Sequence, residues 1–258
     1  MSDTVTRDDA GGVATLTLQR PGLSHALRGD LLAAVQAVGA DESVRAVLIT
    51  GTGRAFCVGQ DLAEHVESLR GNAETSLNVV ADEYNPLMVA LAALRVPVVV
   101  GINGACAGAG LGIALAGDLR IAAAGAKMTT AFTGIGLSSD SALAARLVHS
   151  VGASRATQLL LMPEPFTAET AEQWGLVHRV VPAEQVLTEA QALAARLAAG
   201  PTAAYRGVKT VLATAATDSL EDTLALEARL QAELGRTADH REAVEAFLAK
   251  RAPEFTGR

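Results

Sequence analysis

The sequence is poor in the residues on which nucleic-acid binding depends. Aromatic residues make up 3% of its 258 residues, and 21 basic residues face 28 acidic ones, for a formal net charge of −7. Single-stranded nucleic acid is bound by exposed rings and a basic groove, so we expect no nucleic-acid partner. An anionic ligand must be held by local groups, because the net charge of the chain does not attract it.

Cysteine is also scarce, since Cys57 and Cys106 are the only two. Two cysteines cannot make a disulfide framework or a four-cysteine zinc site, and the five histidines follow no metal-binding spacing, so we expect no metal. Both thiols are expected to pack as small apolar groups. No apolar run reaches the length of about 18 residues that a membrane span needs, and the polar N-terminus does not resemble a signal peptide. We therefore expect a cytoplasmic protein without a membrane partner.

Hydrophobic residues are abundant, at 50% of the chain, and 52 residues are alanine. This composition predicts a core of closely packed helices. Strand and helix patterns alternate to about residue 181, and only helical patterns follow. Nearly continuous apolar runs at 45–50 and 96–101 are typical of strands that are covered on both faces. The sequence thus predicts one α/β core with a helical C-terminal extension.

A pattern of strand, glycine-rich turn and helix occurs twice, at 45–65 and at 96–117. The two turns lie at 57–60 and 107–110. A helix that begins at such a turn presents free backbone N–H groups and the positive end of its dipole, so two turns can aim two donors at one oxyanion. Two alternatives stay open: the glycines only allow close packing, or they bind a nucleotide phosphate. The second is weak, because neither turn carries the Lys-Ser/Thr of a P-loop.

Four segments resemble the enoyl-CoA hydratase/isomerase, or crotonase, superfamily. They are GRAFCVGQDL (53–62), INGACAGAGLGIALAGDLRIA (102–122), AEQWGLVHRVVP (171–182) and AFLAKRAPEFTG (246–257), and they follow the family order over almost the whole chain. The resemblance implies an α/β, crotonase-like fold of repeated ββα units over residues 1–195. It also implies a C-terminal helical trimerisation region at 196–258 within the same structural unit, and a homotrimer or a dimer of trimers.

The resemblance further implies an acyl-CoA substrate, with CoA arriving as part of the substrate and no separate cofactor. The family holds the thioester oxygen with two backbone N–H groups, which on this chain belong to Gln60 and Ala109. The residues that it places along the CoA thioester are Ser24, Ala26, Val58, Gln60, Asp61, Leu62, Ala63, Ala105, Phe132 and Lys209. Without the family, Asp61 is expected to cap a helix and Lys209 to be a solvated helix charge. The stretch 67–90 is expected to shape the acyl pocket.

The chain departs from the family at the acid/base positions. Hydratases of this family use two glutamates, but Gly112 and Phe132 stand where these are expected. Asp140 is the remaining candidate. Its position before an apolar run, after two serines, is typical of a helix N-cap with no chemical role. Within the family, however, it resembles the single acid/base of the ring-forming and double-bond isomerases of phenylacetate catabolism.

The sequence therefore predicts an acyl-CoA enzyme that stabilises a thioester enolate and moves a proton with Asp140. The leading reaction is isomerisation of an enoyl-CoA double bond or of a ring epoxide on an aromatic acyl-CoA. Two alternatives stay open: an enoyl-CoA hydratase of fatty-acid or aromatic-acid degradation, and a weakly active acyl-CoA-binding protein. The apolar Phe132 should desolvate Asp140 and raise its pKa above the usual value of ~3.9.

Overall fold

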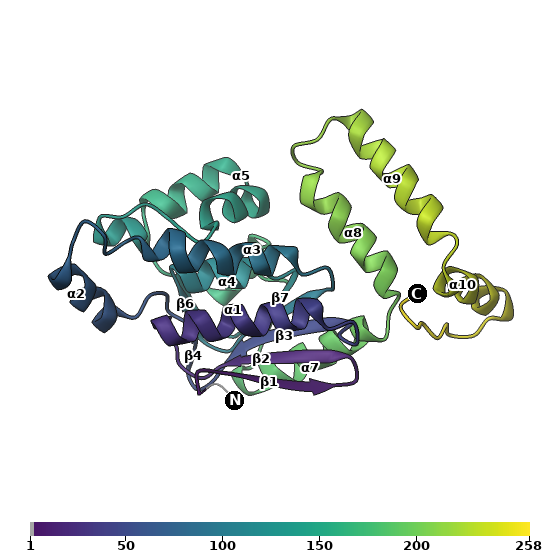
Figure 1. Ribbon diagram of the computed structural model, residues 1–258, viewed down its shortest axis with the longest axis horizontal. Coiled ribbons are helices and arrows are strands. Elements are labelled where there is room, and N and C mark those ends of the chain that lie inside the picture. Colours follow the sequence, from purple (N-terminus) through teal and green to yellow (C-terminus); the bar gives the residue numbers. More distant parts are fainter. Residues whose placement is uncertain (1–2) are drawn as a thin grey trace.

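Two β-sheets form the centre of the computed structural model, which describes residues 3–258 (Figure 1). The larger sheet has the strand order β1-β2-β3-β5-β7-β10, and only its β1–β2 pair is antiparallel. Its strands are β1 (Val5–Ala10), β2 (Val13–Leu18), β3 (Ala46–Gly51), β5 (Val98–Ile102), β7 (Leu119–Ala123) and β10 (Arg179–Val181). The smaller sheet has the order β4-β6-β8-β9, with β4 (Ala55–Cys57), β6 (Ala105–Ala107), β8 (Lys127–Thr129) and β9 (Phe166–Thr167).

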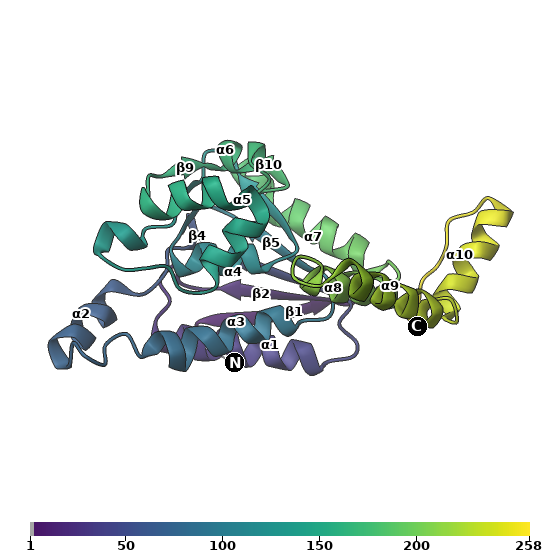
Figure 2. The same cartoon turned by 90° about the horizontal axis from the view of Figure 1, so that it is seen from above.

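Helices cover both faces of the larger sheet. In Figure 2, α1 and α3 lie on one side of the strands and α7 lies on the other. The helices of the core are α1 (His25–Ala40), α2 (Leu62–Gly71), α3 (Asn85–Ala93), α4 (Ala109–Ala116), α5 (Leu143–Leu161), α6 (Ala168–Gln173) and α7 (Val186–Ala198). A π-helical turn, η1 (Val80–Tyr84), leads into α3, and short 3₁₀ turns occur at η2 (Phe132–Ile135) and η3 (Ala183–Gln185).

Small residues set the distance between α7 and the sheet. The buried residues of α7 are Val186, Ala190, Ala194 and Ala198, which follow one another at intervals of one helical turn. On the strand beneath, a Cβ atom at Gly101 would lie 3.3 Å from the methyl group of Ala190. Here the small alanine side chains allow close packing between a helix and the sheet, whereas the composition predicted close packing among helices.

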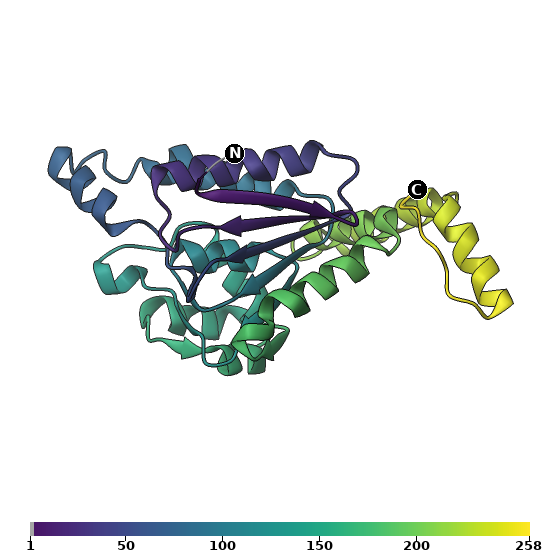
Figure 3. The ribbon, with the colours of Figure 1, turned by 90° about the horizontal axis from the view of Figure 1, so that it is seen from below.

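A helical arm follows α7 and extends away from the sheets (Figure 3). It consists of α8 (Thr202–Thr214), α9 (Leu220–Leu234) and α10 (Ala238–Ala249). Arg45 joins this arm to the core, because its guanidinium donates to the Gly200 carbonyl at 2.6 Å, to Thr202 Oγ1 at 2.9 Å and to the Phe255 carbonyl at 3.1 Å. The boundary expected between residues 195 and 196 falls in the last turn of α7.

Most of the predicted elements are present. The strands expected at 45–50 and 96–101 correspond to β3 and β5. Helix α5 changes direction at Gly152, whose φ of +75° is not helical. The first strand, β1, was not predicted, because its sequence VTRDDA is mostly polar. In the described part of the chain, no helix is both long and apolar enough to cross a membrane.

The start of α4 packs directly on the end of β4. Every residue of α4 is buried, and a Cβ atom at Gly110 would lie only 2.2 Å from the Cys57 carbonyl oxygen. Any side chain at position 110 must therefore push the helix away from the strand. By contrast, a Cβ atom at Gly29, on the exposed face of α1, meets nothing within 4 Å.

These two glycines predict opposite effects of the same substitution. Gly110→Ala should lower the free energy of unfolding by about 1–3 kcal/mol, because it overpacks the α4–β4 contact. Gly29→Ala should raise it by about 0.5–1 kcal/mol, because glycine inside a helix costs conformational entropy. Urea unfolding followed by circular dichroism measures both. Equal stability of the two variants would show that α4 can shift without cost.

Candidate active site

The parallel pairing of β4 with β6 brings the two glycine turns together. Ala55 pairs with Ala105 and Cys57 with Cys106, so both strands end at the same edge of the small sheet. Gly59, with a φ of +85°, lies in the turn after β4, and its Cβ position would be 3.5 Å from the backbone nitrogen of Ala109. The two turns are thus in direct backbone contact.

Two backbone donors at this junction are unused. Within residues 3–258, the N–H groups of Gln60 and Ala109 donate to no protein acceptor. Ala109 is the first residue of α4, so its N–H has no acceptor within the helix and lies at the positive end of the helix dipole. Both residues line the same cavity. The arrangement can hold an oxygen atom that gains negative charge.

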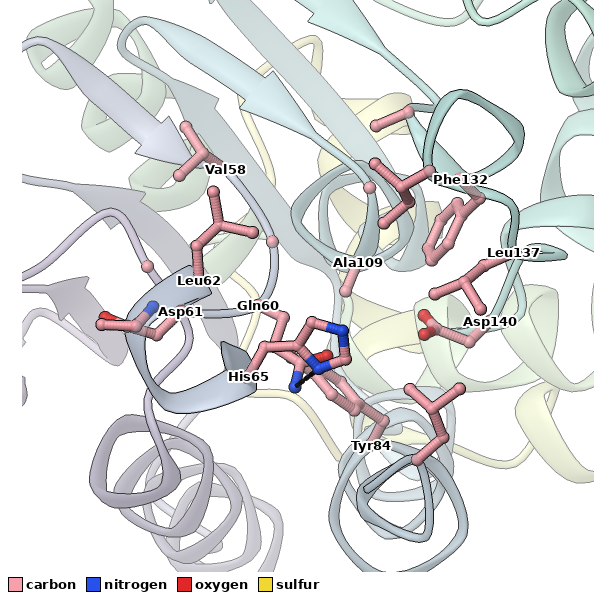
Figure 4. Close-up of a pocket in the computed structure, with 17 residues that line it drawn as sticks. Val58, Gln60, Asp61, Leu62, His65, Tyr84, Ala109, Phe132, Leu137 and Asp140 are labelled. Atoms are coloured by element: carbon pink, nitrogen blue, oxygen red, sulfur yellow. Dashed lines mark hydrogen bonds between the residues drawn. The ribbon is translucent and has the colours of Figure 1, made fainter. Parts of the chain in front are cut away.

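The cavity has a volume of about 550 Å³ and a mostly apolar wall (Figure 4). This volume lies in the range of ~300–1,000 Å³ that is usual for small-molecule sites. Its polar side chains are those of Gln60, Asp61, His65, Tyr84 and Asp140. The rest of the wall is made by Gly22, Val58, Gly59, Leu62, Ala63, Leu77, Gly108, Ala109, Ala131, Phe132, Ile135 and Leu137.

Asp140 directs its carboxyl group into this cavity (Figure 4). One carboxyl oxygen, Oδ1, accepts a hydrogen bond of 2.7 Å from Ser141 Oγ. Desolvation by burial raises the pKa of Asp140, and the hydrogen bond from Ser141 opposes this only in part. The helix-cap interpretation of Asp140 is wrong, because α5 begins at Leu143 and no side chain caps it.

The turn that carries Asp140 has an unusual backbone. Four non-glycine residues in the described chain have a positive φ, and three of them, Ala131, Ser141 and Ala142, lie beside the cavity. Such residues cost on the order of 1–3 kcal/mol each and persist only where the surrounding structure imposes them. Here the surroundings include α4, because a Cβ atom at Gly112 would lie 2.7 Å from the Ser141 carbonyl oxygen. The missing side chain at position 112 therefore lets the Asp140 turn approach α4.

The cavity wall offers one other carboxyl group, that of Asp61. Its Oδ1 accepts hydrogen bonds from the backbone nitrogens of Ala63 at 2.9 Å and Glu64 at 3.2 Å, so it caps α2 as predicted. Among the carboxyl groups of the cavity wall, Asp140 alone has no backbone N–H partner in the described structure. Asp140 is therefore the carboxyl group of the wall that no backbone donor holds.

Comparison with known proteins agrees with this geometry. Residues 8–258 match the family model for enoyl-CoA hydratase/isomerase. The chain belongs to the enoyl-CoA hydratase/isomerase family. Its α/β architecture is the crotonase fold, as the sequence predicted.

Relatives carry both names of this family. A Rhodobacter capsulatus protein named "Probable enoyl-CoA hydratase" is 44% identical, over 99% of this chain and 98% of its own length. The 1,2-epoxyphenylacetyl-CoA isomerase of Escherichia coli is 41% identical, over 96% of both chains. A solved structure from Mycobacterium abscessus that bears the enoyl-CoA hydratase/isomerase name has a TM-score of 0.97 and 50% identity, over 98% of this chain and 100% of that chain.

Most of the site residues that the family resemblance predicts for this chain line one cavity. Those that line it are Val58, Gln60, Asp61, Leu62, Ala63, Ala109, Phe132 and Asp140. Phe132 is 8% exposed, and its ring lies 3.8 Å from the Cβ position of Gly108. Outside the cavity wall, Ser24 caps α1 through a bond to the Leu27 nitrogen, Ala26 lies in the exposed first turn of α1, and Ala105 lies in β6.

Lys209 does not reach the cavity within one chain. Its Nζ donates to Asp118 Oδ2 at 2.6 Å and to the Val96 carbonyl at 3.0 Å. Asp118 also accepts a bond of 2.8 Å from the Val98 nitrogen. Lys209 therefore fixes α8 to the core, and it is neither a free helix charge nor a residue at this chain's own cavity.

The two cysteines are packing residues, as predicted. Cys57 and Cys106 are both fully buried, and burial raises the pKa of the Cys57 thiol to about 12. The pKa of Cys106 is raised for the same reason. Neither thiol is available as a thiolate near neutral pH.

Sequence reasoning missed several residues of the wall. His65, whose Nδ1 lies 3.4 Å from Gln60 Nε2, follows one turn after the Asp61 cap. Leu77 and Tyr84 come from the stretch that was expected to shape the pocket, although neither was singled out. Only their position within that stretch pointed to these two residues. The π-helical turn that carries Tyr84 has no clear sequence signature.

The buried charge of Asp140 predicts a small gain in stability when it is removed. Because its pKa is raised in the folded state, the folded protein binds the proton more tightly than the unfolded chain does. Ionisation therefore lowers stability as the pH rises from the unfolded pKa of ~3.9 through the folded one. Asp140→Asn should have an equal or higher Tm at pH 7, and the difference should vanish at low pH. Calorimetry at both pH values measures this, and a clearly lower Tm at pH 7 would show that the charge stabilises the fold.

Proposed function

We propose that this protein is an acyl-CoA isomerase that holds the thioester oxygen with the N–H groups of Gln60 and Ala109 and moves a proton with Asp140. The observation that carries the proposal is a carboxyl group that no backbone donor holds, in an apolar cavity that also contains two unused backbone donors. Such a cavity supplies one proton carrier and one oxyanion site. Isomerisation of a double bond needs these two groups and no other.

In the simplest reaction, a 3-enoyl-CoA enters with its thioester oxygen between the two N–H groups. Asp140 removes a proton from the α-carbon, and the electron pair moves onto the thioester oxygen to give a dienolate. The two donors stabilise this charge. The protonated Asp140 then returns the proton to the γ-carbon, and the double bond moves to the α,β position. A carboxyl group with a raised pKa suits both steps near neutral pH.

An aromatic acyl group fits the same cavity. Phe132, Ile135 and Leu137 form an apolar wall beside Asp140, and the Escherichia coli relative is named for a ring-epoxide substrate. CoA enters as part of the substrate, and the proposed steps need no metal or separate cofactor.

Hydration is the second candidate, because the Rhodobacter capsulatus relative is named as a hydratase. Addition of water to a double bond requires one group to activate water and one to protonate carbon. Of the two carboxyl groups in the described cavity wall, Asp61 is engaged as a helix cap, which leaves Asp140 for both tasks. The carboxyl group of Asp140 also argues against the third alternative, a weakly active binding protein.

The arm supports self-association. Its helices expose several large apolar side chains, among them Leu212 at 69%, Phe247 at 82% and Leu248 at 75% exposure. Apolar surface of this kind is typical of protein–protein contacts. We infer that α8, α9 and α10 pack against other copies of the chain in a homotrimer or a dimer of trimers.

The native reaction distinguishes the two chemistries. Proton NMR in D₂O should show that 3-enoyl-CoA is converted to 2-enoyl-CoA, with deuterium entering the α- or γ-carbon. Crotonyl-CoA should gain water very slowly, because Asp61, the other carboxyl group of the described cavity wall, is engaged as a helix cap. Hydration at ~10 s⁻¹ or faster, a typical enzymatic rate, would contradict the isomerase proposal.

Asp140→Asn should remove the proton carrier while keeping the shape of the side chain. We expect a loss of ~10²–10⁴-fold in kcat, the usual contribution of general acid/base catalysis. The exposed Asp218→Asn is the matched control and should retain full activity. In the native enzyme kcat/KM should fall at low pH with a midpoint above ~3.9, because Asp140 must be ionised to accept the proton. Retained activity in Asp140→Asn would show that Asp140 is not the base.

A further inference from the structure

Tyr84 carries a polar atom that the structure leaves without a partner. Its side chain is 0% exposed, yet it lines the cavity (Figure 4). Among the described residues, its hydroxyl oxygen has no hydrogen-bond partner. Buried phenolic hydroxyls usually find a partner, and an unpaired one costs more than a paired one contributes. The unpaired Tyr84 hydroxyl therefore destabilises the fold, which points to a functional role for it.

The neighbours of Tyr84 hold its ring in place. The guanidinium of Arg28, from α1, lies over the ring with its Cζ atom 5.3 Å from the ring centre. Arg28 is itself 5% exposed and donates to Glu83 Oε2 at 2.6 Å and to the Leu23 carbonyl. Glu83 and Tyr84 end the π-helical turn η1, a geometry that is frequent at functional sites. These contacts hold the Tyr84 ring in its buried position.

Burial keeps the Tyr84 hydroxyl protonated and therefore able to donate. Burial and the negative charge of Asp140 raise the pKa of Tyr84, and the positive charge of Arg28 opposes them in part. The phenol is protonated at neutral pH. An oxygen atom of a ligand that reaches this buried hydroxyl in the cavity wall would accept its O–H.

We propose that the Tyr84 hydroxyl donates a hydrogen bond to an oxygen atom carried by the acyl group itself, and so selects oxygenated acyl-CoA substrates. The inference rests on the proposed function, in which the thioester oxygen already has two donors, Gln60 and Ala109. A hydrocarbon acyl chain would bury the Tyr84 hydroxyl unpaired, whereas an epoxide, ether or hydroxyl oxygen would satisfy it. Sites built around such a bond reject ligands that lack the oxygen.

Binding of unreactive ligands tests this without depending on catalysis. Phenylacetyl-CoA and its 2-, 3- and 4-hydroxyphenyl analogues are titrated calorimetrically into the native protein, Tyr84→Phe and Tyr205→Phe. Tyr205, in α8, is the only other tyrosine and serves as the matched control. At least one hydroxylated ligand should bind the native protein and Tyr205→Phe about tenfold more tightly than phenylacetyl-CoA does, a difference that one hydrogen bond can supply. Tyr84→Phe should lose this preference.

The outcomes separate the two proposals. A native protein that binds all four ligands equally, or a preference that survives in Tyr84→Phe, overturns the role of Tyr84 and leaves the isomerase proposal intact. Equal weakening of all four ligands in Tyr84→Phe also overturns it, because Tyr84 would then act on a shared part of the ligand or on Asp140. Failure of the native protein to bind any of these thioesters would count against the proposed function as well.

A spectroscopic measurement covers the case in which Tyr84→Phe does not fold. Protein labelled with 3-fluorotyrosine should give two ¹⁹F signals, which Tyr205→Phe assigns. The preferred hydroxylated ligand should shift the Tyr84 signal more than phenylacetyl-CoA does, because it changes the hydrogen bonding of the phenol. Identical shifts with all four ligands would overturn the proposal.

Discussion

The active site depends on the close contact between the start of α4 and the end of β4. No side chain separates Gly110 from the Cys57 carbonyl, and Gly59 lies against the backbone of Ala109. Because β4 and β6 run parallel, both turns leave the sheet at the same edge, and the two unused N–H groups meet there. Their positions are fixed by buried backbone, so they need no reorganisation when charge develops on a bound oxygen. The other residues of the cavity wall surround these two fixed N–H groups.

The opposite wall is built at a cost in stability. Asp140 is a desolvated carboxyl group on a turn in which Ser141 and Ala142 both have a positive φ. Each of these features destabilises the folded state, and the turn is held by its packing against Gly112 in the fully buried helix α4. Strain and perturbed pKa values commonly gather at functional sites, where the surrounding core imposes them. One helix therefore supports both walls, since it supplies a donor to one and a packing surface to the other.

Sequence patterns predicted the parts of this site that depend on glycine or on long apolar runs. The central strands β3 and β5 and the turns at Gln60 and Ala109 were found in this way, because glycine marks where backbone must approach backbone. The β1 strand was missed because one polar edge strand has no apolar pattern. Asp140 looked like a helix cap, since the positive φ of two non-glycine residues leaves no trace in the sequence. Tyr84 was missed because its inward direction comes from a π-helical turn and from Arg28.

The two walls also differ in what they would contact in the proposed function. The backbone donors at the strand–helix junction would act on the thioester, which every acyl-CoA contains. Side chains on the other wall would act on the acyl group, the part of the substrate that varies. Relatives named as a hydratase and as an isomerase resemble this chain to a similar degree, so overall identity does not separate the two reactions. In the proposed function the separation comes from Gly112, Phe132, Asp140 and Tyr84, which would decide how many proton carriers and which hydrogen-bond donors the acyl group meets.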